Sequence, residues 1–333
     1  MKRNIGIKRA VEISLTVLAL VGILAVGAYG QRVTRAIPGL EWAYPVATPQ
    51  PPEMPAQGPK TLPGSKLSLT PQQINDAYNP PDWYPDEHAP LPNIVAHGSQ
   101  VMACALCHLT SGMGHPESAD IAGLPLEYMR RQIADFKAHL RNDAEGYTKA
   151  ARASRMQVIS EGAPREQIDA ALQYFSELEP EDWYDVIEAD MVPKTWVTGG
   201  LMRLPLPGSG MEPIGNRIIT LPKDPERVEM RDPHSGFIAY VPKGSLARGK
   251  ALVTTGGGKT TQCAVCHGED LRGLGDIPRI AGVHPIYLMR QFYNFQSGAN
   301  TSSMGAQMRN VVKDLSRDDM IAIAAYVASL EPK

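Results

Sequence analysis

The sequence predicts an all-α protein in which two tandem copies of one helical domain follow an N-terminal transmembrane helix and a proline-rich stalk. Three observations lead to this fold class. All four cysteines fall in two C-x-x-C-H clusters, the residues around the clusters repeat at a constant offset, and the repeated segments show helical periodicity. The predicted boundaries are 1–35 for the membrane anchor or signal peptide, 36–92 for the stalk, 93–180 and 245–333 for the two domains, and 181–244 for the linker between them.

The N-terminal segment has the composition of a membrane anchor. Basic residues, among them Lys2 and Arg9, precede a run from 10 to 30 that is almost entirely apolar. At about 1.5 Å per residue, this run reaches about 30 Å as a helix, the thickness of a bilayer core. The basic flank favours a single pass through the inner (cytoplasmic) membrane, with the domains on the periplasmic side. A cleaved signal peptide is the alternative, because Ala25 and Gly27 offer a small-x-small site.

Prolines dominate the expected stalk, since residues 36–92 hold 14 of the 29 prolines. Proline lacks a backbone N–H and favours extended geometry, so the composition predicts a semi-rigid spacer outside the core. Trp83 and Tyr84 could dock this spacer against the first domain, and a solvated tether is the alternative. The linker is rich in Pro and Gly and holds two short β-like runs, 217–221 and 237–241. We expect it to be ordered and packed on both domains.

The two domains are copies of one unit. Aligning Cys104 with Cys263 sets an offset of 159 residues; the first copy then carries seven extra residues, after which the offset is 152. So many matches in register indicate an internal duplication of a unit of domain size. The matching pairs are Ile121 with Ile280, Ala122 with Ala281, Gly123 with Gly282, Tyr128 with Tyr287, Gln132 with Gln291, Phe136 with Phe295, Met156 with Met308 and Tyr174 with Tyr326.

Each copy is expected to be helical. Apolar residues recur at three- and four-residue spacing over 124–140 and 283–296, and again in a final helix. In the second copy, Ser316 followed three residues later by Asp319 is an N-cap arrangement close to a capping box.

The two C-x-x-C-H clusters carry the strongest chemical signal in the chain. Residues at i, i+3 and i+4 share one face of a helix, so both sulfurs and the imidazole point the same way. Two thiols can then form thioethers with the vinyl groups of one haem while the adjacent histidine ligates its iron. A thioredoxin-like dithiol would need a βαβ pattern, and a zinc site would need a fourth ligand. We therefore expect two covalently attached haem c groups, bound by Cys104, Cys107, Cys263 and Cys266, with His108 and His267 as iron ligands.

A methionine is the expected ligand on the opposite face of each iron. Met156 and Met308 both stand 18 residues before the tyrosine of the final helix. A soft, neutral thioether raises the potential of a haem, which suits electron transfer. Met304 competes with Met308, His97 could replace Met156, and a methionine that only fills the core is the remaining alternative.

Each ligating histidine is expected to donate its second ring N–H to a backbone carbonyl, which fixes the ring. Pro278 is placed to offer that carbonyl to His267, and Ala119 holds the equivalent position for His108.

In combination these motifs are specific. C-x-x-C-H, then I-A-G-x-x-x-x-Y-x-x-x-Q, then M-x-x-[IV] before a helix that ends in Y-x-x-x-L resembles a class I cytochrome c domain, and the tandem resembles the di-haem cytochrome c4 group. The resemblance covers roughly 93–180 and 245–333. It implies covalent haem, His and Met axial ligands, and transport of single electrons.

We therefore expect a membrane-tethered, periplasmic di-haem cytochrome that carries electrons between a respiratory donor and an oxidase or reductase. No nucleophile or general base stands out, so it is not expected to be an enzyme itself. One alternative is the haem-bearing subunit of a multi-subunit dehydrogenase or respiratory complex, and another is a di-haem peroxidase. The expected partners are the donor and acceptor proteins, and the membrane through the N-terminal helix.

Charge gives an independent detail. The net charge of −2 excludes a strongly cationic nucleic-acid binder. Residues 93–180 hold 8 basic and 11 acidic side chains, a balance of −3, and residues 245–333 hold 10 basic and 7 acidic, a balance of +3. Opposite signs predict a dipolar molecule whose field would orient encounters with redox partners.

Overall fold

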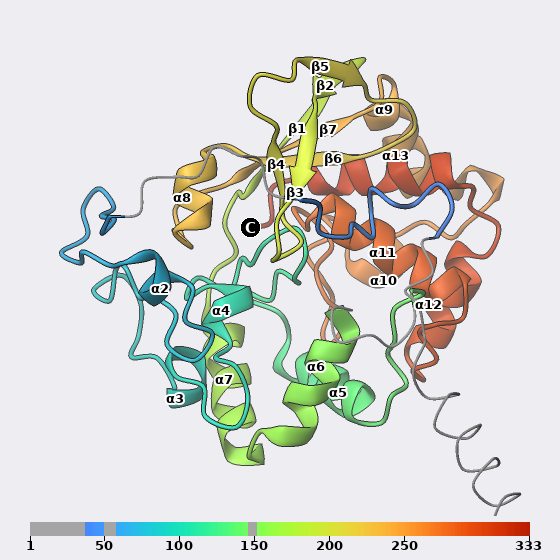
Figure 1. Cartoon of the computed structure of the whole chain (residues 1–333). Helices are drawn as coiled ribbons and strands as arrows, with labels where there is room; N and C mark the ends of the chain where they lie inside the picture. The colour runs from blue at the N-terminus through green and yellow to red at the C-terminus, as the bar shows by residue number, and fades with distance from the viewer. Residues whose placement is uncertain (1–36, 50–57, 146–151) are drawn as a thin grey trace, which may run out of the picture. The chain divides into compact units, whose positions relative to one another are not determined.

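The computed structural model describes residues 37–49, 58–145 and 152–333. Both repeated segments are helical within these ranges (Figure 1). The helices of the first copy are α3 (Asn93–Ala96), α4 (Ala105–His108), α5 (Leu126–Lys137), α6 (Arg152–Gly162) and α7 (Arg165–Glu177). Those of the second copy are α9 (Ser245–Thr255), α10 (Ala264–His267), α11 (Pro285–Gln296), α12 (Gly305–Val312) and α13 (Arg317–Ala328).

The second domain is organised around the close packing of α9 on α13. The Ser316 hydroxyl accepts from the Asp319 amide while the Asp319 carboxylate accepts from the Ser316 amide, so the expected N-cap is confirmed as a full capping box. A Cβ atom at Gly249 of α9 would lie 2.0 Å from the carbonyl oxygen of Ala322 in α13. Only glycine allows two helix backbones to approach so closely at this position.

The linker adds a three-stranded sheet, so the fold is not purely α-helical. β1 (Tyr184–Glu188) pairs in parallel with β7 (Phe237–Val241), and β7 pairs antiparallel with β6 (Ile219–Pro222). β6 and β7 confirm the two strands that the β-like runs predict. β1 escapes prediction because its pairing with β7 spans about fifty residues and leaves no local turn signal.

Smaller elements complete the described chain. They are α2 (Pro71–Ile74), the antiparallel pairs of β2 (Met191–Pro193) with β5 (Met211–Pro213) and of β3 (Thr195–Val197) with β4 (Arg203–Pro205), helix α8 (Pro225–Glu229) and a 3₁₀ turn at Gly256–Gly258.

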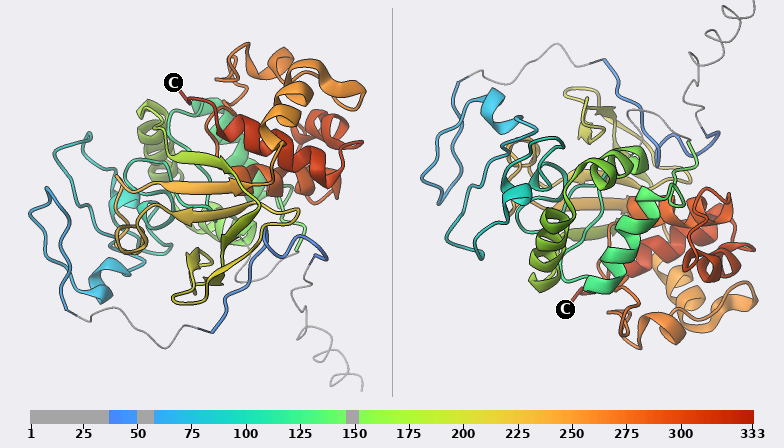
Figure 2. Two further views of the ribbon diagram at one scale, coloured as in Figure 1. Left: turned by 90° about the horizontal axis from the view of Figure 1, so that it is seen from above. Right: turned by 90° about the horizontal axis from the view of Figure 1, so that it is seen from below.

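The sheet packs on both domains, and the view from above shows its strands lying against helices of both (Figure 2). Phe237 lies in one apolar cluster with Leu109 and Met113 of the first domain. Val241, at the other end of the same strand, lies in the core of the second domain with Ile321. The linker is thus ordered and holds the two domains together.

Part of the expected stalk belongs to the core instead. Leu40 is fully buried among residues of the second domain, and the Tyr44 hydroxyl donates to Asn294 Oδ1 at 2.8 Å. Trp83 is buried as well, and its Nε1 donates to the carbonyl of Met230 in the linker at 2.6 Å. The expectation of a spacer outside the core is therefore wrong for these described parts, because their aromatic side chains outweigh the extended preference of the prolines.

The expected location as a single-pass protein of the inner membrane is also corrected. In the described ranges, no helix is long and apolar enough to cross a bilayer. The longest helix in these ranges, α7, has 13 residues, whereas a bilayer span needs about 20. The apolar run from 10 to 30, on which the expectation rested, lies outside the described residues.

Equivalent residues of the two domains face each other where the domains meet. Asp120 and its equivalent Arg279 form a buried ion pair at 2.5 Å. Arg141 and its equivalent Asn300 form an isolated antiparallel bridge between the backbones. Contacts between equivalent positions are the mark of an isologous interface, so the duplicated chain has the geometry of a fused homodimer.

Candidate functional site

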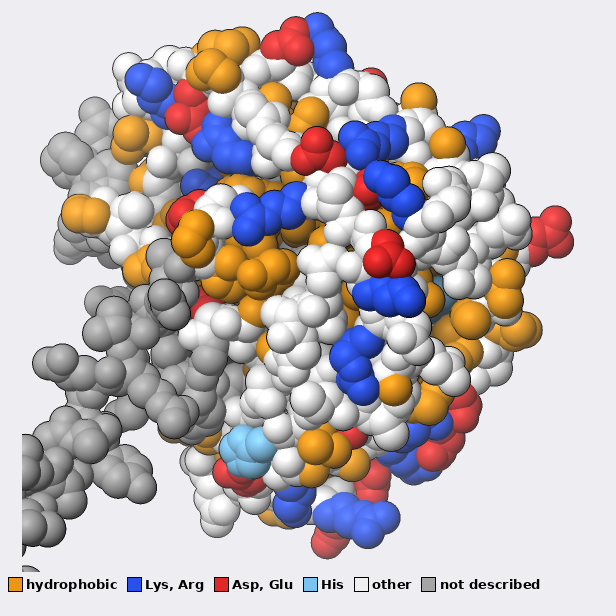
Figure 3. Space-filling view, turned by 90° about the vertical axis from the view of Figure 1, so that its right-hand side faces the viewer, with side chains coloured by type: hydrophobic (Ala, Val, Ile, Leu, Met, Phe, Trp, Pro, Cys, Tyr) orange, Lys and Arg blue, Asp and Glu red, His pale blue; other side chains and the backbone are white. Residues whose placement is uncertain are grey.

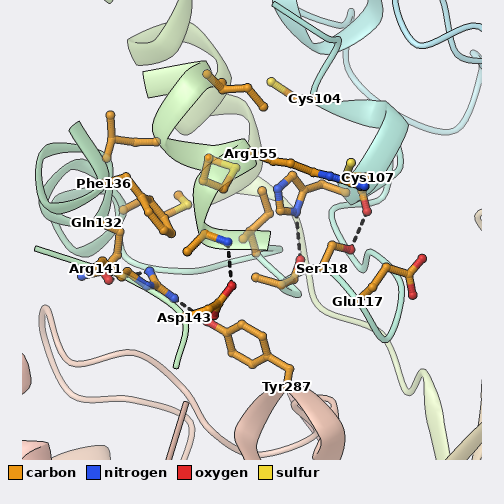
Figure 4. A pocket seen from close by; sticks show the side chains of 18 of the residues that line it. Cys104, Cys107, Glu117, Ser118, Gln132, Phe136, Arg141, Asp143, Arg155 and Tyr287 are labelled. Atoms are coloured by element: carbon orange, nitrogen blue, oxygen red, sulfur yellow. Dashed lines mark hydrogen bonds between the residues drawn. The ribbon is translucent and has the colours of Figure 1, made fainter. Parts of the chain in front are cut away.

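Helix α4 positions the first C-x-x-C-H cluster. Cys104 stands at its N-cap, and Cys107 and His108 follow within one helical turn, so all three line one cleft (Figure 4). His108 Nδ1 donates to the carbonyl of Ala119 at 2.9 Å, and Ser118 Oγ donates to the carbonyl of Cys107 at 2.6 Å. The loop that follows α4 is thus tied back to it and holds the imidazole in one orientation.

Helix α10 repeats this arrangement in the second domain. Cys263 at the N-cap, Cys266 and His267 line a second cleft. His267 Nδ1 donates to the carbonyl of Pro278 at 2.8 Å. Both expected carbonyl acceptors are therefore confirmed. A proton on Nδ1 leaves the lone pair on Nε2, which is the form of imidazole that binds a metal.

A tight return of the chain follows each histidine. Leu109 has φ of 61° and its equivalent Gly268 has φ of 84°, in the left-handed region that favours glycine. Leu109 tolerates this conformation because its side chain is buried among apolar neighbours. The amide six residues after each histidine then donates to that histidine's carbonyl, at 3.0 Å from Gly114 and 2.8 Å from Gly273.

Burial favours the neutral forms of both histidines and of the first cysteine in each cluster. It lowers the pKa of His108 and of His267, and it raises the pKa of the Cys104 thiol to about 12 and of the Cys263 thiol to about 11. A protonated thiol is a poor metal ligand and a poor redox nucleophile. Among the described residues, no group of three or more His, Cys, Asp and Glu side chains is placed to hold a metal ion.

A methionine lines each cleft together with its cluster. Met156, in α6, lies in the wall of the first cleft, and Met308, in α12, lies in the wall of the second. Met304, at the N-cap of α12, also lines the second cleft, but it is 40% exposed, whereas Met308 packs against the core. His97 is exposed, and its Nδ1 lies 3.0 Å from Asn79 Oδ1. The structure thus brings each predicted set of four site residues to a single cleft.

Both clefts suit a large apolar cofactor. They hold about 1370 and 1570 Å³ of space, part of it open to solvent. Two thiols for thioethers, an imidazole lone pair and a thioether sulfur are the donor set that a haem c requires. The residues present therefore fit this group. The apolar walls include Leu124, Ile133, Phe136 and Leu172 in the first cleft, and Val283, Leu288, Phe292 and Phe295 in the second.

The two clefts adjoin at the domain boundary. The Y-x-x-x-Q run places a Tyr and a Gln on the same face of α5 and of α11, because positions i and i+4 are neighbours on a helix. The repeated Y-x-x-x-Q pattern therefore indicates this polar junction between the clefts. Arg141, just beyond α5, carried no such signal. The residues that line both clefts are Leu124, Tyr128, Gln132, Arg141, Tyr287 and Gln291.

The two clusters differ in what covers them. Val265 is 64% exposed and Cys266 is exposed, whereas the equivalent Leu106 and Cys107 are half-buried. Arg231 of the linker covers the first cluster, since its Nη1 donates to the carbonyl of Leu106 at 2.6 Å. On the face at the right of Figure 1, where α12 lies, hydrophobic side chains gather in a hollow beside Lys and Arg side chains (Figure 3).

Comparison with known proteins agrees with this geometry. The cytochrome c family model matches residues 95–187 and 246–331, together more than half of the chain. Cytochrome c-552 of Acidithiobacillus ferridurans is 23% identical over 231 residues, which are 68% of this chain and 73% of the relative. The thiosulfate dehydrogenase electron acceptor of Stutzerimonas stutzeri (strain A1501) is 33% identical over 88 residues, which are 25% of this chain and 39% of the relative.

Among solved structures, cytochrome c4 of Acidithiobacillus ferrooxidans covers 68% of this chain and 98% of its own, with 22% identity and a TM-score of 0.43. The family match falls on both duplicated domains and includes both C-x-x-C-H clusters. The chain belongs to the cytochrome c family, with one domain of that family in each of its two duplicated segments, and it carries electrons.

Proposed function

We propose that each cleft holds one haem c and that the two haems make the protein a relay for single electrons. The observation that carries this proposal is the recurrence of one constellation in both clefts: a helical turn with two thiols, an imidazole fixed through Nδ1, and a methionine in the cleft wall. In the proposal Cys104, Cys107, His108 and Met156 hold the first haem, and Cys263, Cys266, His267 and Met308 hold the second.

A bound haem iron supplies reversible one-electron chemistry between its ferric and ferrous states. The chain contributes the rest. The carbonyls of Ala119 and Pro278 fix the imidazoles, and the apolar walls exclude water, which limits the reorganisation that a change of charge would cause.

Covalent haem content tests the proposal directly. The intact mass of the holoprotein is expected to exceed that of the polypeptide by two haem groups, and the colour should stay with the protein during acid-acetone extraction. The double variant Cys263→Ser/Cys266→Ser should lose one haem and keep the other. Extraction of all colour from the wild type would contradict covalent attachment at both clusters.

A periplasmic location belongs to the same proposal. Attachment of haem to C-x-x-C-H is completed outside the cytoplasm, so a protein with two such sites has to be exported. Fractionation of cells that express the full chain is expected to place the haem-stained band in the periplasmic fraction, and recovery of holoprotein from the cytoplasm would contradict it.

Electron exchange with partners is proposed to use the second domain. Its cluster is exposed at Val265 and Cys266, whereas Arg231 covers the first cluster. The balance of +3 on residues 245–333 favours a redox protein that surrounds its own cofactor with acidic side chains.

A second candidate function is that of electron-accepting subunit in a dehydrogenase. The relative that is itself named a thiosulfate dehydrogenase electron acceptor favours it, at 33% identity over 88 residues. Co-purification of a catalytic subunit with the full chain from its native cells is the test. A chain that elutes alone, and that exchanges electrons equally well with several unrelated redox proteins, would contradict it.

A further inference from the structure

Arg141 is a buried cation at the junction of the two clefts. It is 9% exposed and lines both clefts. It follows α5 in the first domain and reaches toward α11 of the second, where Figure 4 shows it beside Tyr287 and close to Gln132. No other Arg or Lys side chain in the described ranges lines both clefts.

The partners of Arg141 are all neutral. Its Nη1 donates to Gln132 Oε1 at 2.6 Å, and its Nη2 donates to Tyr287 Oη at 2.8 Å and to Gln291 Oε1 at 3.3 Å. Its Cζ lies 4.6 Å from the centroid of the Phe136 ring. Three acceptors leave part of the five N–H groups of the guanidinium unused.

The buried carboxylate beside it is engaged elsewhere. Asp143 Oδ1 accepts from Asn294 Nδ2 at 2.9 Å, and Asp143 Oδ2 accepts from the amide of Ala153 at 2.8 Å. Arg141 therefore has no ion pair within the described part of the chain. Burial of a charge is costly unless an opposite charge meets it, so the junction is built to receive an anion.

The equivalent position in the second domain does not supply a second cation. Asn300 stands there, is buried, and turns its Oδ1 to the amide of Ser302 at 3.1 Å. A single guanidinium, that of Arg141, thus lines both clefts.

A haem carries two propionate groups, which are the anions that two haems would bring to this junction. We propose that Arg141 binds propionate groups of both haems and thereby sets the potentials of the two together. This inference rests on the proposed function, since it needs one haem in each cleft. Guanidinium is the side chain best suited to it, because its planar fork matches two carboxylates at once. A fixed positive charge beside a haem opposes the ferric state, so Arg141 raises both potentials.

Redox titration of the holoprotein tests the proposal, with optical resolution of the two haems. Arg141→Gln is expected to lower both potentials, each by about the 59 mV that corresponds to a tenfold change in a one-electron equilibrium constant. Arg130→Gln is the matched control. It removes the same charge from α5, but Arg130 is exposed, pairs with Glu127 and lines neither cleft, so both potentials should stay at their wild-type values.

Haem content measured on every variant separates this proposal from the proposed function. Fewer than two haems in the wild type would refute the function itself. Two haems, with Arg141→Gln shifting neither potential more than the control or shifting only one, would overturn the role of Arg141.

The conservative variant Arg141→Lys covers the case in which Arg141→Gln does not fold. It keeps the charge and loses the fork, so both potentials should remain near those of the wild type while the propionate-bending bands of the resonance Raman spectrum shift for both haems. Unchanged propionate bands in a folded, fully loaded Arg141→Lys protein would also overturn the proposal.

Discussion

Asp120 and Arg279 occupy equivalent positions in the two domains, and they form a buried ion pair with each other at 2.5 Å. In a dimer of identical chains, a residue near the two-fold axis meets its own copy, so a charged residue there would meet a like charge. Duplication within one chain removes this restriction. The two positions carry opposite charges here, so they attract each other and hold the domains together at a point where exact two-fold symmetry would place two like charges.

The first prediction concerns this ion pair. Asp120→Asn is expected to lower the free energy of unfolding by about 3–5 kcal/mol, because it leaves the Arg279 guanidinium buried without a counter-charge. Denaturant unfolding of the holoprotein measures the change. Asp185→Asn is the control, since it removes the carboxylate of an exposed pair with Lys223 and should cost less than about 1 kcal/mol. Equal losses in the two variants would show that the buried pair contributes nothing special.

The second prediction is an acid sensitivity of the second domain. Burial alone would raise the pKa of Asp319, but hydrogen bonds from Lys259, Ser316 and Arg248 outweigh it and hold that pKa well below its usual range. A depressed folded-state pKa contributes stability that is complete above the unfolded value of about 3.9 and is lost as the pH falls below it. Asp319→Asn should therefore lower stability at neutral pH and flatten the loss of unfolding free energy below about pH 4. Parallel pH profiles for wild type and variant would refute this origin of the sensitivity.

The third prediction concerns the close approach of α9 to α13. Gly249→Ala places a Cβ 2.0 Å from the carbonyl oxygen of Ala322, so the helices have to separate, at a cost of about 1–3 kcal/mol or more. Gly199→Ala adds the same methyl group where no atom lies within 4 Å and should change stability by less than about 0.5 kcal/mol. Thermal unfolding followed by far-ultraviolet circular dichroism compares the two, and a tolerated Gly249→Ala would mean that the crossing is looser than described.

The fourth prediction distinguishes two methionines of the second cleft. Met308→Ala is expected to abolish the weak methionine-to-iron absorption band of one haem and to lower its potential, because a thioether ligand favours the ferrous state. Met304→Ala should leave both properties unchanged, since Met304 is partly exposed at the start of α12. Optical spectra and redox titration report both effects. Loss of the band in Met304→Ala alone would assign the ligand to Met304.

The fifth prediction concerns partner docking. Val265→Asp is expected to slow electron exchange with an acidic redox partner about tenfold, because it adds a like charge to the exposed second cluster. Val158→Asp is the control, since Val158 is 52% exposed on α6 and receives the same change. Stopped-flow mixing at several salt concentrations measures the rates. A slower rate in Val158→Asp and not in Val265→Asp would place the docking surface on the first domain.

The chemistry of this protein could be predicted from short local patterns. The two clusters, the carbonyls that hold His108 and His267, and the capping box at Ser316 all depend on residues within about a dozen positions of one another. Such features survive in almost any tertiary context. The constant offset between the copies singled out Met156 and Met308, because residues that match in register can be compared even when they lie far from the clusters.

The contacts that the proline-rich segment and the linker make with the two domains could not be predicted from local patterns. Tyr44 meets Asn294 and Trp83 meets Met230 across separations of 250 and 147 residues, and a proline-rich composition says nothing about such contacts. β1 finds its partner β7 far along the chain for the same reason. Arg141 stands outside every repeated motif, so only its position between the clefts reveals it.

The linker side chain Arg231 has a consequence for how the protein is made. It contacts the carbonyl of Leu106, next to Cys107, from more than a hundred residues further along the chain, whereas Cys266 is exposed. If haem is attached at both clusters as proposed, we expect attachment at the amino-terminal cluster to precede the docking of Arg231, whereas Cys266 stays open to solvent after folding.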